Sequence, residues 1–141
     1  MTIFVKNKHT LQIDEFKFKC SIGKKGSTIS KKEGDKKTPI GKFSLDNIYY
    51  RHDKKIKPIS KLKSIKIRKT MGWCNDTKSE RHYNKLINTK TIFKYEKLFR
   101  KDYKYDYLIP IKYNWKNTKL GSGSAIFIHL TRDYKPTAGC I

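Results

Sequence analysis

Two residues near the carboxyl end of the chain can together perform nucleophilic chemistry. Cys140 supplies a thiol, and His129, eleven residues upstream, supplies a base that can take its proton. An extended segment of this length spans at most about 36–40 Å, so the loop containing Pro136 must fold back if the side chains are to meet. Because Gly139 has no side chain, the N–H groups of Gly139 and Cys140 are open to a substrate carbonyl, as in an oxyanion hole. A core histidine and an incidental buried cysteine remain the alternative interpretation.

A short strand is expected to carry the histidine. Residues 125–130 form an apolar run with β-branched and aromatic members, bounded upstream by residues 121–123 (GSG) and downstream by a polar loop. Runs of this length and composition are typical of buried strands. His129 would therefore stand near the end of a strand, before the loop that leads to Cys140.

Several separated motifs accompany this pair along the chain. They are Gly34-Asp35, residues 37–41 (KTPIG), Phe43, residues 71–74 (MGWC), Asp76, Tyr83-Asn84 and the turn Thr137-Ala138-Gly139-Cys140. Together with His129 they resemble a subgroup of the L,D-transpeptidase catalytic domain family (YkuD-type), which has the patterns GDxKTPxGxF, MGWC and SAIFxHxxRxxYxPTxGC. The resemblance extends from about Phe18 to Ile141. Ala138 departs from the wider family, many members of which carry a second histidine there.

The resemblance implies a mainly β fold, an L,D-transpeptidase-type β-sandwich of two mixed sheets with one or two short helices, as a single domain over residues 1–141. It implies that Cys140 attacks a peptidoglycan stem tetrapeptide at the bond between the diamino acid and D-alanine, with His129 as general base. An acceptor amine would then take the acyl group in a 3→3 cross-link. Water as acceptor would make the same site a carboxypeptidase, and the sequence leaves both open. The resemblance implies no metal or organic cofactor, and it implies a location in the cell envelope or periplasm.

Four further residues are expected to contact the substrate. They are Thr137, Arg132, Trp73 and Asp76, and the resemblance places the segment around Trp73 near the substrate groove. The base also needs a group that fixes its tautomer and angle. We expect a backbone carbonyl in that role rather than the side chain of Asp133.

The charge of the chain raises a rival function. With 34 Lys and Arg against 12 Asp and Glu, the 141 residues carry a formal net charge of +22, which attracts polyanions such as nucleic acids. The basic residues are spread along the whole chain, and no RNA-recognition, zinc-finger or basic-zipper signature accompanies them. A nucleic-acid or polyanion-binding module is therefore the less favoured alternative to the peptidoglycan stem peptides that the resemblance implies as the partner. The three cysteines, at positions 20, 74 and 140, lack the spacing of a zinc site or a disulfide framework.

Most of the remaining chain is expected to form strands. Alternating apolar residues predict strands within residues 2–5, 43–50, 64–68 and 105–113, and a hairpin that turns at Asp14-Glu15. Pro110 would place its strand at a sheet edge or at a bulge, because proline cannot donate to a ladder.

Two other patterns predict a turn and a helix. Residues 38–41 (TPIG) carry proline and glycine at the second and fourth positions, which fits a type I turn. Ile92, Tyr95 and Phe99 have the spacing of one helix face, which predicts an amphipathic helix over residues 91–101.

The two ends of the chain give two more expectations. The amino-terminal apolar run, Ile3, Phe4 and Val5, is too short for a secretory signal or a membrane span, which need about 7–15 and about 20 apolar residues. The chain stops one residue after Cys140, whereas family members continue through a further strand. We therefore expect a copy truncated at its carboxyl end, in which the α-carboxylate of Ile141 would raise the pKa of the thiol.

Overall fold

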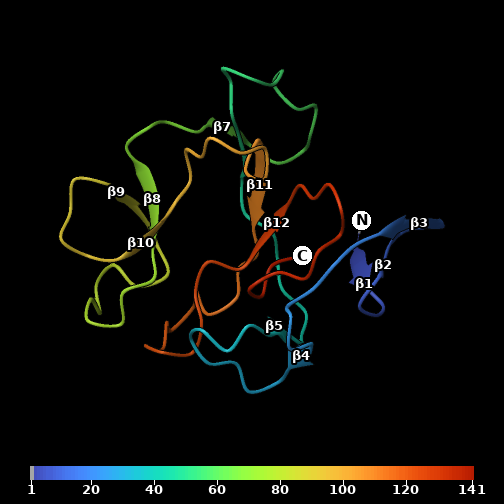
Figure 1. Cartoon of the computed structure of the whole chain (residues 1–141), viewed down its shortest axis with the longest axis horizontal. Helices are drawn as coiled ribbons and strands as arrows, with labels where there is room; N and C mark the ends of the chain where they lie inside the picture. The colour runs from blue at the N-terminus through green and yellow to red at the C-terminus, as the bar shows by residue number, and fades with distance from the viewer. Residues whose placement is uncertain (1) are drawn as a thin grey trace.

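Residues 2–141 are described by a computed structural model, in which they form twelve short strands and no helix (Figure 1). The mainly β class expected from the sequence is confirmed, and each predicted strand is present in a shorter form. In chain order the strands are β1 (Ile3–Val5), β2 (Thr10–Ile13), β3 (Phe16–Lys19), β4 (Ser27–Thr28), β5 (Thr38–Pro39), β6 (Ile48–Tyr50), β7 (Ser64–Lys66), β8 (Met71–Cys74), β9 (Leu86–Asn88), β10 (Tyr95–Lys97), β11 (Tyr107–Pro110) and β12 (Phe127–His129).

The strands are divided among four sheets instead of the two mixed sheets expected. Their orders are β1-β2-β3, β10-β8-β9, β12-β11-β6-β7 and β4-β5. The four-stranded sheet is mixed, because β6 and β7 run parallel while its other neighbours are antiparallel. It lies near the centre of Figure 1, with β8–β10 on one side and β1–β3 on the other. No helix suited to crossing a membrane occurs in the part of the chain that the structure describes.

Pro110 lies within the four-stranded sheet, on a strand that has neighbours on both sides. β11 pairs with β12 and with β6, so the proline is not at a sheet edge. Leu108 faces Tyr49 on β6, but Ile111 is bridged to Leu45, which is one residue out of that register. The extra residue lies between Leu45 and Tyr49, so the irregularity is on the segment opposite Pro110 and not on the proline's own strand, as the second predicted setting required. The missing N–H of Pro110 nevertheless lies where regular pairing with β6 has ended.

The helix predicted over residues 91–101 is wrong. Its central part is β10, which pairs antiparallel with β8. So short a helix is marginal in water, whereas the edge of β8 offers backbone partners to this segment. Gly72 on β8 leaves room for the facing ring, since an added Cβ would lie 2.6 Å from Tyr95 Cδ2. Ile92, the first residue of the predicted apolar stripe, is 95% exposed.

The two turn predictions have opposite outcomes. Asp14-Glu15 turns the hairpin between β2 and β3, with Asp14 in the left-handed region at φ 51°. Thr38, predicted to begin a type I turn, instead begins β5, which pairs in parallel with β4. The local pattern failed because long-range bonds to β4 and its neighbour Gly26 engage the N–H groups of Thr38 and Ile40.

An aromatic core joins the four-stranded sheet to β8. The Phe127 ring packs edge-on against Trp73, with 5.4 Å between centroids, and against Tyr105, with 5.9 Å. Leu108 and Cys140 belong to the same buried cluster. The strand that carries His129 is therefore anchored at its first residue, and removing the Phe127 ring would cost about 3–5 kcal/mol of folding free energy.

Candidate active site

The last residue of the chain runs beside the strand that carries the histidine. The Ile141 N–H donates to the Phe127 carbonyl (2.9 Å), and the His129 N–H donates to the Ile141 carbonyl (3.0 Å). These two bonds pair Ile141 with β12 in a parallel sense, on the side opposite β11. His129 is the last residue of β12, in line with the prediction that it lies near the end of a strand, and His129 and Cys140 both line one cavity of about 500 Å³.

The thiol of Cys140 is buried and neutral. The residue is 8% exposed, and its S–H donates to the Ala125 carbonyl at 3.4 Å. Burial raises the pKa of the Cys140 thiol to about 12, and the Glu96 carboxylate adds to that rise, while the Phe127 N–H and the Lys31 ammonium oppose it. The thiolate that attacks a carbonyl must therefore form during the reaction.

The imidazole of His129 is held in one tautomer. Its Nδ1 lies 2.9 Å from the Leu130 carbonyl, which can only accept, so Nδ1 carries the hydrogen and Nε2 is free to accept a proton. The expectation of a backbone carbonyl as the orienting group is confirmed. Burial lowers the pKa of His129, as do the nearby Lys104 and Arg100 cations, so the ring is neutral at pH 7.

The turn before Cys140 is closed by the Thr137 hydroxyl. It donates to the Cys140 carbonyl at 2.7 Å and accepts the Gly139 N–H at 3.1 Å. The Gly139 N–H, expected in the oxyanion hole, is thus engaged within the turn. The Cys140 N–H has no acceptor among residues 2–141 and remains available to a substrate oxygen.

One of the four expected substrate residues, Thr137, lines the cavity. Arg132 lies outside this lining, with its guanidinium 4.7 Å from the Tyr103 ring centroid. Trp73 is 2% exposed in the core, and Asp76 is 8% exposed and accepts the N–H groups of Lys78 and Lys94. The structure gives these last two positions a packing and a loop-fixing role, and substrate contact by Arg132, Trp73 and Asp76 stays a prediction.

Three residues that the sequence did not single out line the cavity near His129. Glu96 accepts from the Tyr105 hydroxyl at 3.1 Å and from Arg100 at 3.2 Å, and the Tyr105 and His129 ring centroids are 5.4 Å apart. Asp102 accepts from the other edge of the Arg100 guanidinium, through Nε at 2.9 Å and Nη2 at 2.6 Å. No local pattern marked Glu96 and Arg100 as site residues, because residues 91–101 were expected to form a helix, and Tyr105 was expected only as part of the strand within residues 105–113.

Residues 2–141 contain no group of three His, Cys, Asp or Glu side chains placed to hold a metal ion. The arrangement can support acyl transfer, because a thiol, a base with a free nitrogen and a backbone N–H without an acceptor belong to residues that line one cavity.

Comparison with known proteins identifies the family. The model of the L,D-transpeptidase catalytic domain (YkuD) matches residues 1–141, the whole chain. No curated protein and no solved structure gives a significant match. Membership of this family implies L,D-transpeptidase-type activity on peptidoglycan peptides, in line with a thiol and an imidazole at one cavity. Since the match spans every residue, the chain belongs to the L,D-transpeptidase catalytic domain family.

Proposed function

We propose that the protein is a cysteine acyltransferase that uses Cys140 to cleave the bond between the diamino acid and D-alanine of a peptidoglycan stem tetrapeptide. The observation that carries this proposal is that Cys140 and His129 line the same cavity while Leu130 holds the His129 ring with Nε2 free. The family match supports the substrate class. A location in the cell envelope, where this substrate occurs, is part of the same proposal.

Acylation begins with two neutral groups. His129 Nε2 takes the thiol proton as sulfur attacks the peptide carbonyl, which forms the S–C bond and moves the carbonyl π electrons onto oxygen. The Cys140 N–H donates to that oxyanion, and the Gly139 N–H contributes only when it exchanges Thr137 for the oxyanion. Collapse breaks the C–N bond, and the His129 imidazolium gives its proton to the departing amine of D-alanine.

Deacylation decides between two products. An acceptor amine from another stem peptide attacks the thioester, loses a proton to His129 and restores the Cys140 thiol, which gives a 3→3 cross-link. Water in the same position gives a tripeptide. Cross-linking is the proposed reaction and carboxypeptidase activity is the alternative, which the products of a single assay separate.

An intact-mass experiment tests the proposal. The protein is incubated with a diaminopimelate-containing tetrapeptide, and the adduct and the released D-alanine are measured together. Cys74→Ala is the matched control, because Cys74 is a second buried thiol that lies on β8 and does not line the cavity. We expect the acyl adduct in the wild type and in Cys74→Ala, and its loss in Cys140→Ala. An adduct that persists in Cys140→Ala, or a folded wild type that forms none, would overturn the proposal.

A further inference from the structure

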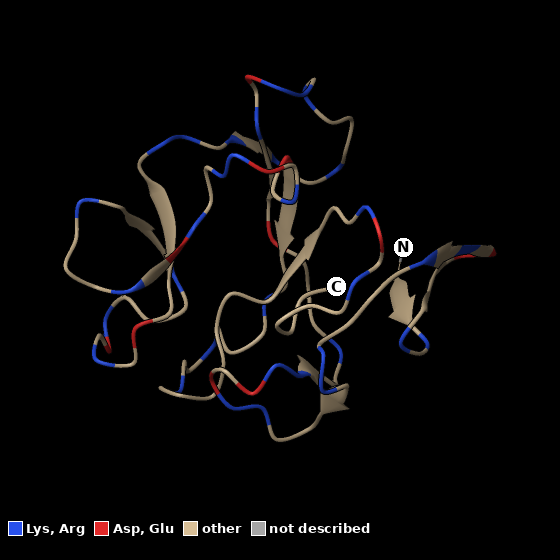
Figure 2. Ribbon diagram, viewed as in Figure 1, with Lys and Arg blue, Asp and Glu red and all other residues tan. Residues whose placement is uncertain are grey.

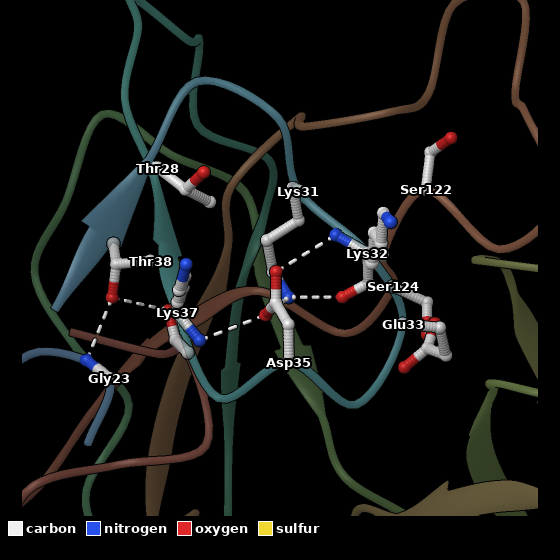
Figure 3. A network of polar contacts seen from close by, with 12 residues as sticks. Gly23, Thr28, Lys31, Lys32, Glu33, Asp35, Lys37, Thr38, Ser122 and Ser124 are labelled. Atoms are coloured by element: carbon white, nitrogen blue, oxygen red, sulfur yellow. Dashed lines mark hydrogen bonds and ion pairs between the residues drawn. The ribbon is translucent and has the colours of Figure 1, made fainter. Parts of the chain in front are cut away.

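The hydroxyl of Thr38 links three segments at the nucleophile turn. Thr38, the first residue of β5, is 5% exposed. Its Oγ1 donates to the Gly139 carbonyl at 2.9 Å and accepts the Gly23 N–H at 2.9 Å. Figure 3 shows this side chain beside Gly23 and next to the loop of Lys31, Asp35 and Lys37. A group bonded in both directions cannot rotate without losing a buried hydrogen bond.

The hydrogen bond from Thr38 to the Gly139 carbonyl also affects the Cys140 N–H, which belongs to the same peptide unit. The Gly139 carbonyl and the Cys140 N–H belong to one planar trans peptide, so they point in opposite directions. Fixing the carbonyl on Thr38 therefore fixes the direction in which the Cys140 N–H points. That N–H is the group that would meet an oxyanion.

Gly139 itself does not restrict this peptide to one orientation. Its φ is +142°, a conformation that side-chain-bearing residues rarely adopt, and glycine is free to leave it. An added Cβ at Gly139 would lie 2.9 Å from the Lys37 carbonyl, so the turn passes directly over the Lys37-Thr38 backbone. The restraint on the peptide must come from its partners, and Thr38 is the partner of its carbonyl.

The loop that carries Thr38 is itself held rigidly. Asp35 accepts the Lys37 N–H at 2.9 Å, the Lys32 N–H at 2.8 Å and the Lys31 ammonium at 2.6 Å (Figure 3). The Lys31 side chain is only 3% exposed, so this ion pair is a fixed part of the interior. Thr38 follows Lys37 directly, so the contacts of Asp35 also fix the position of the Thr38 hydroxyl.

We propose that Thr38 is a positioning residue that aims the Cys140 N–H at the oxyanion through the Gly139–Cys140 peptide. The proposal rests on the acyl transfer proposed above. It predicts that removal of the Thr38 hydroxyl weakens transition-state stabilisation and changes substrate binding little, because the oxyanion exists only after attack has begun.

Thr38→Val and Thr38→Ser separate this role from packing. Valine keeps the shape and loses both hydrogen bonds, whereas serine keeps the hydroxyl. Loss of one oxyanion donor costs about 10²–10³ in kcat, so a misdirected donor in Thr38→Val should cost roughly 10- to 100-fold, with KM for D-alanine release within about twofold. Thr38→Ser should retain wild-type kcat within about threefold. Thr38→Ala serves as the second hydroxyl-free variant if Thr38→Val does not fold.

Alkylation of Cys140 by iodoacetamide is the readout that a merely structural role would move. This reagent is attacked at a saturated carbon and forms no oxyanion, so its rate in Thr38→Val should equal that of the wild type. A parallel fall in alkylation and D-alanine release, a wild-type kcat in Thr38→Val, or a Thr38→Ser as slow as the hydroxyl-free variants would each overturn the proposal. In those three cases the wild type still releases D-alanine and the proposed function stands. A folded wild type that releases none would overturn both.

Discussion

At pH 7 the thiol of Cys140 and the imidazole of His129 are both neutral, and burial further favours the neutral form of each by moving its pKa away from 7. Burial raises the pKa of the thiol to about 12 and lowers the pKa of the imidazole below its ordinary value of 6.5. In this respect the pair is closer to a serine–histidine pair than to a thiolate–imidazolium pair, since the proton must move as the bond forms.

The reactivity of Cys140 toward iodoacetamide should keep rising with pH. Because only the thiolate reacts and the pKa is about 12, the rate should increase roughly tenfold per pH unit from pH 7 to pH 10 without a plateau. Site-resolved mass spectrometry measures the rate, with Cys140→Ala to confirm the peptide. The same protein in urea is the control, since its thiol titrates near the ordinary value of 9.0. A plateau below pH 9 in the folded protein would contradict the expected burial effect.

The acid limb of activity should lie below pH 6.5. The imidazolium cannot accept a proton, so D-alanine release falls as His129 becomes protonated, and burial delays that protonation to a lower pH. The plot of kcat/KM against pH should reach half its plateau below pH 6.5. His129→Gln, which keeps a polar side chain but no base, should lower kcat about 10²- to 10⁴-fold. A midpoint above 6.5 would show that His129 is stabilised as a cation.

At the scale of elements, the sequence predicts the features that are determined by a few neighbouring residues. The hairpin at Asp14-Glu15 and the strand that ends at His129 were found because turn chemistry and apolar runs act over a few residues. The helix predicted over residues 91–101 was wrong because the spacing of its apolar residues matches a helix face. The pairing of this segment with the edge of β8 cannot be inferred from local sequence. The Glu96 and Thr38 contacts were missed for the same reason, since each joins segments that only the folded chain brings together.

The loop between β4 and β5 depends on one buried ion pair. Asp35→Ala would leave the Lys31 ammonium buried without its partner, and breaking such a pair by removing one side costs about 3–5 kcal/mol. The urea midpoint should therefore fall sharply. The matched control is Lys31→Met combined with Asp35→Ala, which removes both charges and should recover most of the loss. Equal midpoints for the single and the double variant would show that the buried charge is not the cause.

The same ion pair predicts a loss of stability in acid. Burial raises the pKa of Asp35, but the bond from Lys31 and the N–H groups of Lys32 and Lys37 outweigh it, and the net pKa is lowered from 3.8. A lowered native pKa stabilises the fold above the unfolded value, and that contribution is lost as pH falls below about 4. The urea midpoint of the wild type should therefore drop between pH 5 and pH 3 by more than that of the Lys31→Met, Asp35→Ala double variant.

At the scale of the whole molecule, the basic residues that give the net charge of +22 are spread along the whole chain. Lys and Arg occur on loops throughout the chain, as Figure 2 shows. Distributed positive charge attracts any polyanion regardless of its sequence. In DNA complexes, contacts to phosphates position the protein, whereas contacts to bases give sequence specificity. Binding to DNA would thus be expected even if the protein never meets DNA as a partner.

Duplexes of unrelated sequence should bind with equal affinity at 50 mM salt, and the affinity should fall about 10³- to 10⁵-fold by 200 mM salt if 6–10 phosphates are contacted. Cys140→Ala should bind identically, because the thiol is buried and uncharged. Titration of labelled duplexes at several salt concentrations measures both. Affinity that distinguishes sequences and survives 200 mM salt would establish nucleic-acid recognition as a function of its own. Salt-sensitive, sequence-blind binding would instead be a consequence of composition, and the cavity of His129 and Cys140 would remain the part of the molecule with a specific chemistry.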